Sequence, residues 1–352
     1  MPTKDDLRYF QALPLDIKVA MTRQRIREWV REYGSGGVYV SFSGGKDSTV
    51  LLHIVRQDFP DVEAVFVNTG LEYPEIQRFV QTFDNVTRLR PTMRFDEVIR
   101  KYGYPIISKE VAETVSQARK SLERNDGKYT YRLQKLYGTL KDKDGNPSIF
   151  NTTKYEPLLH VDFLVSQECC NVMKKKPTKN FEKQTGKTPI IATMAEESLL
   201  RTQRWLKEGC NAFEAKRPSS KPMSFWTEQD VLQYIKQNDI PLASVYGDIE
   251  YATDPEQLRL WDCFGGECGS DPLATTGCDR TGCIFCAFGC HLDGDTSRFQ
   301  RLKQTHPRQY EYCIGGGAYD TDGLWKPNDK GLGMGHVFDE LNKIYGDGFI
   351  KY

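Results

Sequence analysis

Residues 38–49 read Val-Tyr-Val-Ser-Phe-Ser-Gly-Gly-Lys-Asp-Ser-Thr, and this stretch predicts the fold. Its apolar first half is typical of a short buried strand, and an apolar, helix-compatible segment follows from Val50. A strand, a tight Gly-Gly turn and a helix N-terminus together form a cradle for phosphate. Its backbone N–H groups point at the anion, and the helix dipole adds a favourable potential.

The turn Ser-Gly-Gly-Lys-Asp-Ser at residues 43–48 lacks the glycine spacing of the commonest nucleotide loop. It resembles the PP-loop of the ATP pyrophosphatase superfamily, whose members cleave ATP between the α and β phosphates. The resemblance implies catalytic roles for Lys46 and Asp47. It also implies that ATP or a related adenine nucleotide binds to Ser43, Gly44, Gly45, Lys46, Asp47 and Ser48, with Mg²⁺ sharing the charge of the phosphates.

Three further segments narrow the resemblance to the phosphoadenylyl-sulfate (PAPS) reductase family. Residues 63–75 predict a second buried strand followed by a turn at Thr69 and Gly70. Residues 190–201 are similar to the family's strand followed by Glu-Ser-x-x-Arg, and residues 221–235 to its Trp-Thr-x-x-Asp-Val helix. The resemblance implies that the nucleotide also contacts Thr69, Gly70, Glu197, Ser198 and Arg201. Within the last segment, Thr227 is expected to cap the helix and Asp230 to complement its dipole.

The ten cysteines form a second pattern. The first residues are charged, with no apolar run typical of a secretory signal, so we expect a cytoplasmic protein without membrane association. In that setting such cysteine spacings indicate metal or redox chemistry rather than a disulfide framework. Cys210 and Cys313 are expected to be buried, inert thiols, whereas Cys263 and Cys268 form a weaker candidate metal pair.

Four of the cysteines resemble the ligands of the iron–sulfur branch of this family, which pairs Cys-Cys with a later Cys-x-x-Cys. The resemblance implies a [4Fe–4S] cluster, and four thiolates suit that cluster. Its ligands would be Cys169, Cys170, Cys283 and Cys286. Zinc is the alternative cofactor, because a second group of residues could satisfy a tetrahedral ion: Cys278, Cys283, Cys286 and Cys290, with His291 adjacent.

The sulfonucleotide reductases of the family carry their nucleophile in a C-terminal Glu-Cys-Gly-Leu-His-like tail, but no cysteine follows Cys313 here. The first hypothesis is therefore an enzyme that uses ATP to adenylate an acceptor, a small molecule or a nucleic acid, for sulfur-type chemistry. A partner protein would donate electrons or sulfur. One alternative is a reductase that makes sulfite from adenylyl sulfate or PAPS, and a second is a non-catalytic nucleotide sensor.

Length and composition allow an α/β fold in which a parallel twisted sheet has helices on both faces. Predicted strands near 38–42, 63–67 and 189–193 alternate with helices, and an amphipathic helix over 15–33 precedes them. We expect a nucleotide-binding domain over 1–260, with an insertion at about 121–160, and a cysteine-rich extension over 261–352. Lys+Arg and Asp+Glu both total 48, so the composition excludes a general affinity for polyanions.

Overall fold

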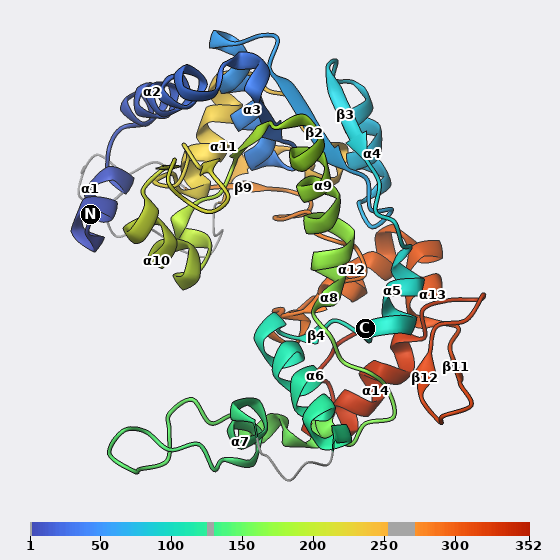
Figure 1. The fold of residues 1–352 in the computed structure, drawn as a ribbon. Helices are drawn as coiled ribbons and strands as arrows, with labels where there is room; N and C mark the ends of the chain where they lie inside the picture. Colours follow the sequence, from blue (N-terminus) through green and yellow to red (C-terminus); the bar gives the residue numbers. More distant parts are fainter. Residues whose placement is uncertain (1, 125–129, 253–271) are drawn as a thin grey trace, which may run out of the picture. The chain divides into compact units, whose positions relative to one another are not determined.

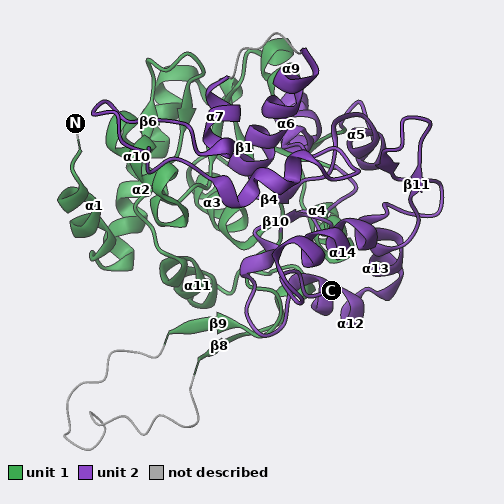
Figure 2. Ribbon diagram, turned by 90° about the horizontal axis from the view of Figure 1, so that it is seen from below, with its two compact units in different colours: residues 1–68, 72–90, 178–281 green, residues 69–71, 91–177, 282–352 purple. Residues whose placement is uncertain are grey.

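The computed structural model describes residues 2–124, 130–252 and 272–352. These residues form two compact units that alternate along the chain (Figure 2). The first comprises residues 1–68, 72–90 and 178–281, and the second comprises 69–71, 91–177 and 282–352. The domain boundary expected at residue 260 was based on sequence motifs, whereas these units are defined by spatial contacts, so the boundary stays a prediction. None of the helices among the described residues combines the length and apolar character needed to cross a membrane.

The first unit is built on a six-stranded sheet with the order β3-β2-β1-β5-β7-β6. Figure 1 labels β2 and β3 of this sheet. All neighbouring strands pair in parallel except β6 and β7. The expected strands are confirmed and three unexpected ones extend the sheet at its edges. The strands are β1 (Val38–Ser41), β2 (Glu63–Val67), β3 (Val86–Leu89), β5 (Thr188–Ile191), β6 (Asn211–Ala212) and β7 (Ser219–Ser220).

Both faces of this sheet are covered, as the sequence predicts. Val38 and Val40 face the large core, whereas Tyr39 between them faces Phe181 on the opposite side. This alternation follows from the two-residue period of a strand. The large core is lined mainly by α2 (Leu15–Tyr33), α3 (Lys46–Asp58), α4 (Pro74–Gln81) and α11 (Glu228–Gln237). Leu7 and Trp205 from two further helices also belong to it, and α9 (Lys176–Thr185) covers the other face.

Shorter elements complete the first unit. Helix α1 (Lys4–Gln11) precedes α2, and α10 (Leu199–Glu208) follows β5 through a 3₁₀ turn (Ala195–Glu197). A two-stranded antiparallel ribbon joins β8 (Ile249–Tyr251) to β9 (Leu273–Thr275). The expected cap of α11 is present, because Thr227 and Asp230 each bond the other's backbone N–H in a capping box.

The second unit is mainly helical. Strands β4 (Ile106–Ile107) and β10 (Ala287–Phe288) pair in parallel, so the segment after Cys286 lies beside the start of α6. The other pair is antiparallel, β11 (Ala318–Tyr319) with β12 (Trp325–Lys326). The helices are α5 (Phe95–Tyr102), α6 (Lys109–Arg124), α7 (Tyr131–Tyr137), α8 (Glu168–Cys170), α12 (Arg298–Thr305), α13 (Pro307–Ile314) and α14 (Met334–Tyr345).

Candidate functional site

The glycine turn lies where the sequence predicts it, between the C-terminal end of β1 and the N-terminus of α3. Gly44 has φ +72°, a conformation that residues with a side chain rarely adopt. A Cβ atom at Gly44 would lie 2.8 Å from Cγ2 of Val80 and 2.9 Å from Cγ2 of Ile76, both in α4. Close approach to α4 and a positive φ therefore both require glycine here.

The two serines of the turn bind one another across it. The Oγ atoms of Ser43 and Ser48 lie 3.0 Å apart, and the Ser43 N–H donates to Ser48 Oγ at 3.1 Å. The Ser48 hydroxyl also donates to the Gly45 carbonyl at 2.9 Å. These bonds hold the turn in a defined shape at the first turn of α3, whose N-terminal amides and dipole favour an anion.

Lys46 and Asp47 open α3 and are largely buried. The Lys46 side chain is 4% exposed, and its Nζ lies 2.6 Å from Oε1 of Glu228. Burial raises the pKa of Asp47 from its ordinary 3.8 to about 6, although the charge of Lys46 acts to lower it. Oδ1 of Asp47 is buried and has no hydrogen-bond partner among the described residues. A buried carboxylate of this kind is typical of functional sites.

The predicted Glu-Ser-x-x-Arg residues belong to the same unit and form a local network. Ser198 caps α10 by accepting the Arg201 N–H, and the Arg201 guanidinium forms an ion pair with Glu197. Glu197 also lies 3.7 Å from Arg280, and the charges of both influence Asp47. The structure therefore brings Glu197 into the electrostatic surroundings of the loop. Nucleotide binding by Glu197, Ser198 and Arg201 stays a prediction.

Thr69 and Gly70 belong to the second unit, so the structure does not place them at the loop. Gly70 has φ +74°, and Thr69 Oγ1 accepts the Leu71 N–H at 3.1 Å. The predicted turn is present, whereas its contact with a nucleotide stays a prediction.

Sequence reasoning missed four residues around the loop: Glu228, Tyr246, Asp279 and Thr281. Glu228 lies within the Trp-Thr-x-x-Asp-Val segment, from which only the cap at Thr227 and the dipole interaction of Asp230 were predicted. Tyr246 Oη accepts the N–H of Lys46 at 3.2 Å, although the two residues are 200 positions apart. Asp279 accepts a hydrogen bond from Lys46 Nζ through its backbone carbonyl, which any residue type would provide. No local sequence signal could have identified these contacts.

The four predicted cluster cysteines line one pocket of the second unit, together with Leu71, Phe95, Pro105, Met173 and Lys174. Cys169 and Cys170 end α8, and a π-helical turn (Asn171–Lys175) follows them directly. Single π turns inside helices are frequent at functional sites. The structure thus brings together a pair and a Cys-x-x-Cys that lie more than a hundred residues apart in the sequence.

Electrostatics makes the two adjacent cysteines different. The hydrogen bond from Cys169, together with the charges of Lys109, Lys174 and Lys175, lowers the pKa of Cys170 to about 6. The same hydrogen bond, together with burial, raises the pKa of Cys169. Cys170 is therefore the thiolate of the pair at neutral pH, the form that acts as nucleophile and metal ligand.

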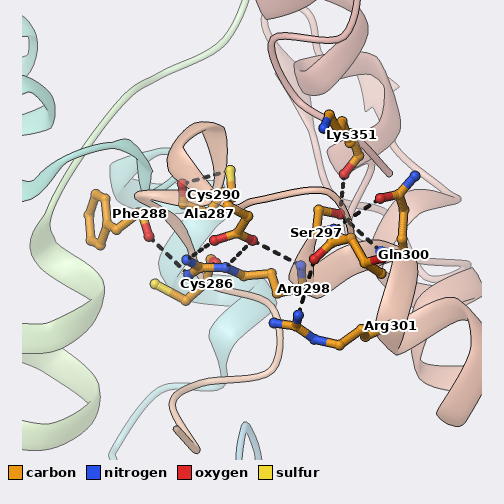
Figure 3. A network of polar contacts seen from close by, with 11 residues as sticks. Cys286, Ala287, Phe288, Cys290, Ser297, Arg298, Gln300, Arg301 and Lys351 are labelled. Atoms are coloured by element: carbon orange, nitrogen blue, oxygen red, sulfur yellow. Dashed lines mark hydrogen bonds and ion pairs between the residues drawn. The ribbon is translucent and has the colours of Figure 1, made fainter. Parts of the chain in front are cut away.

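Arg298 holds the segment that follows Cys286 (Figure 3). Its guanidinium donates to the carbonyl of Phe288 at 3.0 Å and to that of Cys286 at 3.4 Å. Two further bonds, at 2.9 and 2.7 Å, join it to the Asp293 carboxylate, and these raise the pKa of Arg298. Such a bidentate pair fixes orientation as well as charge. The first residue of α12 therefore defines the path of the chain beside the Cys-x-x-Cys.

The remaining cysteines differ in their surroundings. Cys290 is buried, its thiol donates to the Ala287 carbonyl at 3.0 Å, and burial raises its pKa to about 12. Cys313 is fully buried against Met334, and burial raises the pKa of Cys210. Cys263 and Cys268 lie outside the described residues.

The donor chemistry of the four-cysteine pocket fits an iron–sulfur cluster, because thiolates are the usual ligands. Within the described ranges, however, no three His, Cys, Asp or Glu side chains are arranged to hold a metal ion. The alternative zinc set divides between the units, with Cys278 in the first and Cys283, Cys286 and Cys290 in the second. Both cofactors stay predictions.

Comparison with known proteins identifies the family. The family model described as the phosphoadenosine phosphosulfate reductase domain matches residues 37–132 and 101–288. This chain belongs to the PAPS reductase family. The matched region of this family member includes both the loop at 43–48 and the four cysteines of the pocket.

Curated relatives cover most of the chain. An adenosine 5′-phosphosulfate reductase from Geobacillus kaustophilus is 26% identical over 253 residues, which span 68% of this chain and 85% of the relative. A phosphoadenosine 5′-phosphosulfate reductase from Xylella fastidiosa is 30% identical over 285 residues, spanning 76% and 95%. A solved PAPS reductase from Candida auris, in a phosphate complex, is 13% identical with a TM-score of 0.36, covering 77% of this chain and 96% of its own.

Proposed function

We propose that this protein is a sulfonucleotide reductase, which converts adenylyl sulfate or its 3′-phosphorylated form to sulfite. Its membership of the PAPS reductase family over residues 37–288 is the observation that supports this proposal. That region takes in the glycine loop and several cysteines, and the reaction needs a site for phosphate groups and a cysteine thiolate. We therefore favour the reductase over the adenylating enzyme, although no cysteine follows Cys313 in the sequence.

In the proposed reaction, residues 43–48 and Lys46 hold the phosphate groups of the nucleotide. A cysteine thiolate attacks the sulfur of the sulfonucleotide, the S–O bond breaks, and the adenine nucleotide leaves with the bonding electrons. One thiol of a reducing dithiol then attacks the cysteine sulfur of the S-sulfocysteine, which releases sulfite and forms a mixed disulfide. The second thiol breaks that mixed disulfide, which restores the cysteine thiol and leaves the dithiol as a disulfide. A thioredoxin-like protein supplies that dithiol in our proposal.

Two cysteines are candidates for the nucleophile. Cys170 has a pKa of about 6 and is a thiolate at neutral pH. The sequence Glu267-Cys268-Gly269 repeats the first three residues of the tail that carries the nucleophile in sulfonucleotide reductases. Mass spectrometry of the unmodified protein distinguishes them, because the peptide that carries the S-sulfo adduct contains the nucleophile, and its substitution by serine should remove the adduct.

We further propose that Cys169, Cys170, Cys283 and Cys286 hold a [4Fe–4S] cluster, in which case Cys268 is the nucleophile. A bound cluster would supply a redox-active, charged group beside the four-cysteine pocket. In this proposal, Arg298 keeps the Cys-x-x-Cys segment in place and the lysines near Cys170 balance negative charge. Anaerobically purified protein should contain about four irons per chain with matching acid-labile sulfide. Colourless protein with stoichiometric zinc would contradict the cluster.

The adenylating transferase remains a second candidate because one observation favours it. The loop keeps the complete Ser-Gly-Gly-Lys-Asp-Ser motif, with Lys46 buried at its centre. Such an enzyme would cleave ATP between the α and β phosphates with Mg²⁺ and transfer the adenylyl group to an acceptor oxygen.

One set of assays separates the candidates. Anaerobic protein is incubated with thioredoxin and either adenylyl sulfate or PAPS, and sulfite is measured. In parallel, ATP and Mg²⁺ are added and pyrophosphate is measured with candidate sulfur acceptors. Sulfite that disappears in Lys46→Ala supports the reductase, whereas pyrophosphate without sulfite supports the transferase. Nucleotide binding without either product would instead indicate the sensor.

A further inference from the structure

The anion-binding groups of the loop are already bonded within the first unit. The Lys46 N–H, the first helical amide of α3, donates to Tyr246 Oη at 3.2 Å. The Gly45 N–H donates to Ser43 Oγ at 3.3 Å, and the Ser43 N–H is bonded to Ser48 Oγ. These are the donors that a phosphate group would need in such a cradle.

The charge of Lys46 is also engaged. Its Nζ pairs with Glu228 Oε1 at 2.6 Å and donates to the backbone carbonyl of Asp279. Only 3% of Lys46 is exposed, so these partners replace water almost completely. A phosphate can use this ammonium group only if it displaces at least one of them.

Tyr246 is tied to the segment 277–281, and we call the two together the strap. Tyr246 Oη lies 2.6 Å from Thr281 Oγ1, and the N–H groups of Gly277 and Cys278 donate to the carbonyls of Tyr246 and Val245 at 2.9 Å. Tyr246 is 1% exposed. The strap lies directly over the turn, because a Cβ atom at Gly45 would be 3.2 Å from Tyr246 Oη and 3.4 Å from Thr281 Oγ1.

We propose that the strap competes with the nucleotide for the loop, so that Tyr246 and Thr281 set its affinity. This inference rests on the proposed function, because it requires the phosphate groups to bind at residues 43–48. The Lys46 N–H cannot fully serve both a hydroxyl and a phosphate oxygen, so binding must move Tyr246 Oη away. The fraction of molecules in which the strap has left the loop then limits the observed affinity for the nucleotide.

The strap also provides hydrogen-bond partners for the buried polar groups of the loop. The two hydroxyls satisfy one another and the Lys46 amide inside a buried region, where an unsatisfied group is costly. Glu228 and the Asp279 carbonyl satisfy Lys46 in the same way. The loop is therefore stable before the nucleotide binds. The net binding free energy of the nucleotide is the difference between its own bonds to the loop and the bonds to the strap that it replaces.

The test uses two substitutions that weaken the strap and leave the residues of the loop itself unchanged. Tyr246→Phe removes the hydroxyl and keeps the ring, and Thr281→Val removes the second hydroxyl at nearly constant volume. Calorimetry of the full chain with ATP–Mg²⁺ and with PAPS should show binding about fivefold tighter for each variant, the value of one neutral hydrogen bond. Tyr234→Phe is the matched control, because that hydroxyl bonds to His53 at 3.1 Å rather than to the loop.

Cys278 provides an independent readout in the unmodified protein. It lies within the strap and its side chain is partly exposed. If the nucleotide displaces the strap, alkylation of Cys278, followed by mass spectrometry of its peptide, should accelerate when ATP–Mg²⁺ or PAPS is added. This readout keeps the test valid if either variant fails to fold.

The outcomes separate this inference from the proposed function. Weaker binding to Tyr246→Phe and Thr281→Val would mean that the hydroxyls contact the nucleotide, which overturns the strap. Unchanged binding together with unchanged alkylation of Cys278 would overturn it too. Neither result affects sulfite formation, which tests the reductase separately. Absence of nucleotide binding to every form would overturn both.

Discussion

Replacing Asp47 by asparagine should change how the stability of the first unit depends on pH. Burial raises the pKa of this carboxyl from 3.8 to about 6, so the folded state favours its protonated form. That difference corresponds to about 3 kcal/mol. The wild type carries this cost in full above about pH 7, and loses it progressively as the pH falls through 6 towards 4.

Asparagine has no proton to bind, so Asp47→Asn should remove the pH-dependent part of the cost. The advantage of the variant over the wild type in unfolding free energy should therefore be about 2.5 kcal/mol larger at pH 8 than at pH 4. Urea unfolding followed by tryptophan fluorescence measures this, because Trp29, Trp205 and Trp226 all belong to the first unit. Because the two units can unfold in separate transitions, only the unfolding transition that changes the tryptophan fluorescence is analysed.

The pH dependence of the difference in unfolding free energy is more informative than its value at one pH, because the new amide makes hydrogen bonds of its own at every pH. Asp61→Asn is the control, since Asp61 is an exposed carboxyl of the same unit. A stability difference between Asp47→Asn and the wild type that stays constant from pH 4 to pH 8 would refute the reasoning. It would mean that Asp47 is solvated or is neutralised by Lys46 in the folded protein.

Three further predictions concern other parts of the molecule. Arg298→Ala should speed alkylation of Cys286, since two carbonyls lose their hydrogen-bond donor. The alkylation rate of Arg298→Lys should be intermediate. Unchanged rates in both variants would argue against a positioning role for Arg298. Cys170→Ser should lose the iron that anaerobic protein contains, measured with acid-labile sulfide, whereas retention of all the iron would exclude Cys170 as a ligand. Thr227→Ala should lower the unfolding free energy by about 1 kcal/mol in the same fluorescence assay, because it removes a helix cap; an unchanged midpoint would contradict this.

Local patterns predicted the elements that position the loop. The alternation around Val40 and the glycines after Phe42 predicted β1, the turn and α3, because each is governed by neighbours a few residues apart. The cap at Thr227 was predicted for the same reason. Strands β6 and β7 were missed because each is only two residues long, too short for any periodic signal.

The candidate sites were predictable only in part. Chemical identity and spacing singled out Cys169, Cys170 and the later Cys-x-x-Cys, and all four line one pocket. Nothing near Lys46 in the sequence pointed to Tyr246, and nothing near Cys286 pointed to Arg298. Their roles depend on backbone groups and on contacts between distant segments, which leave no pattern in residue type.

The sequence by itself determined the family, the glycine turn and the set of thiols, because these depend on residue types at short, regular spacings. Tertiary structure alone decided that burial raises the pKa of Asp47, that Cys170 rather than Cys169 is the thiolate, and that Tyr246 and Thr281 cover the loop. The physical reason is that pKa values and hydrogen-bond competition depend on burial and on distances to residues far along the chain. Those quantities exist only once the chain has folded.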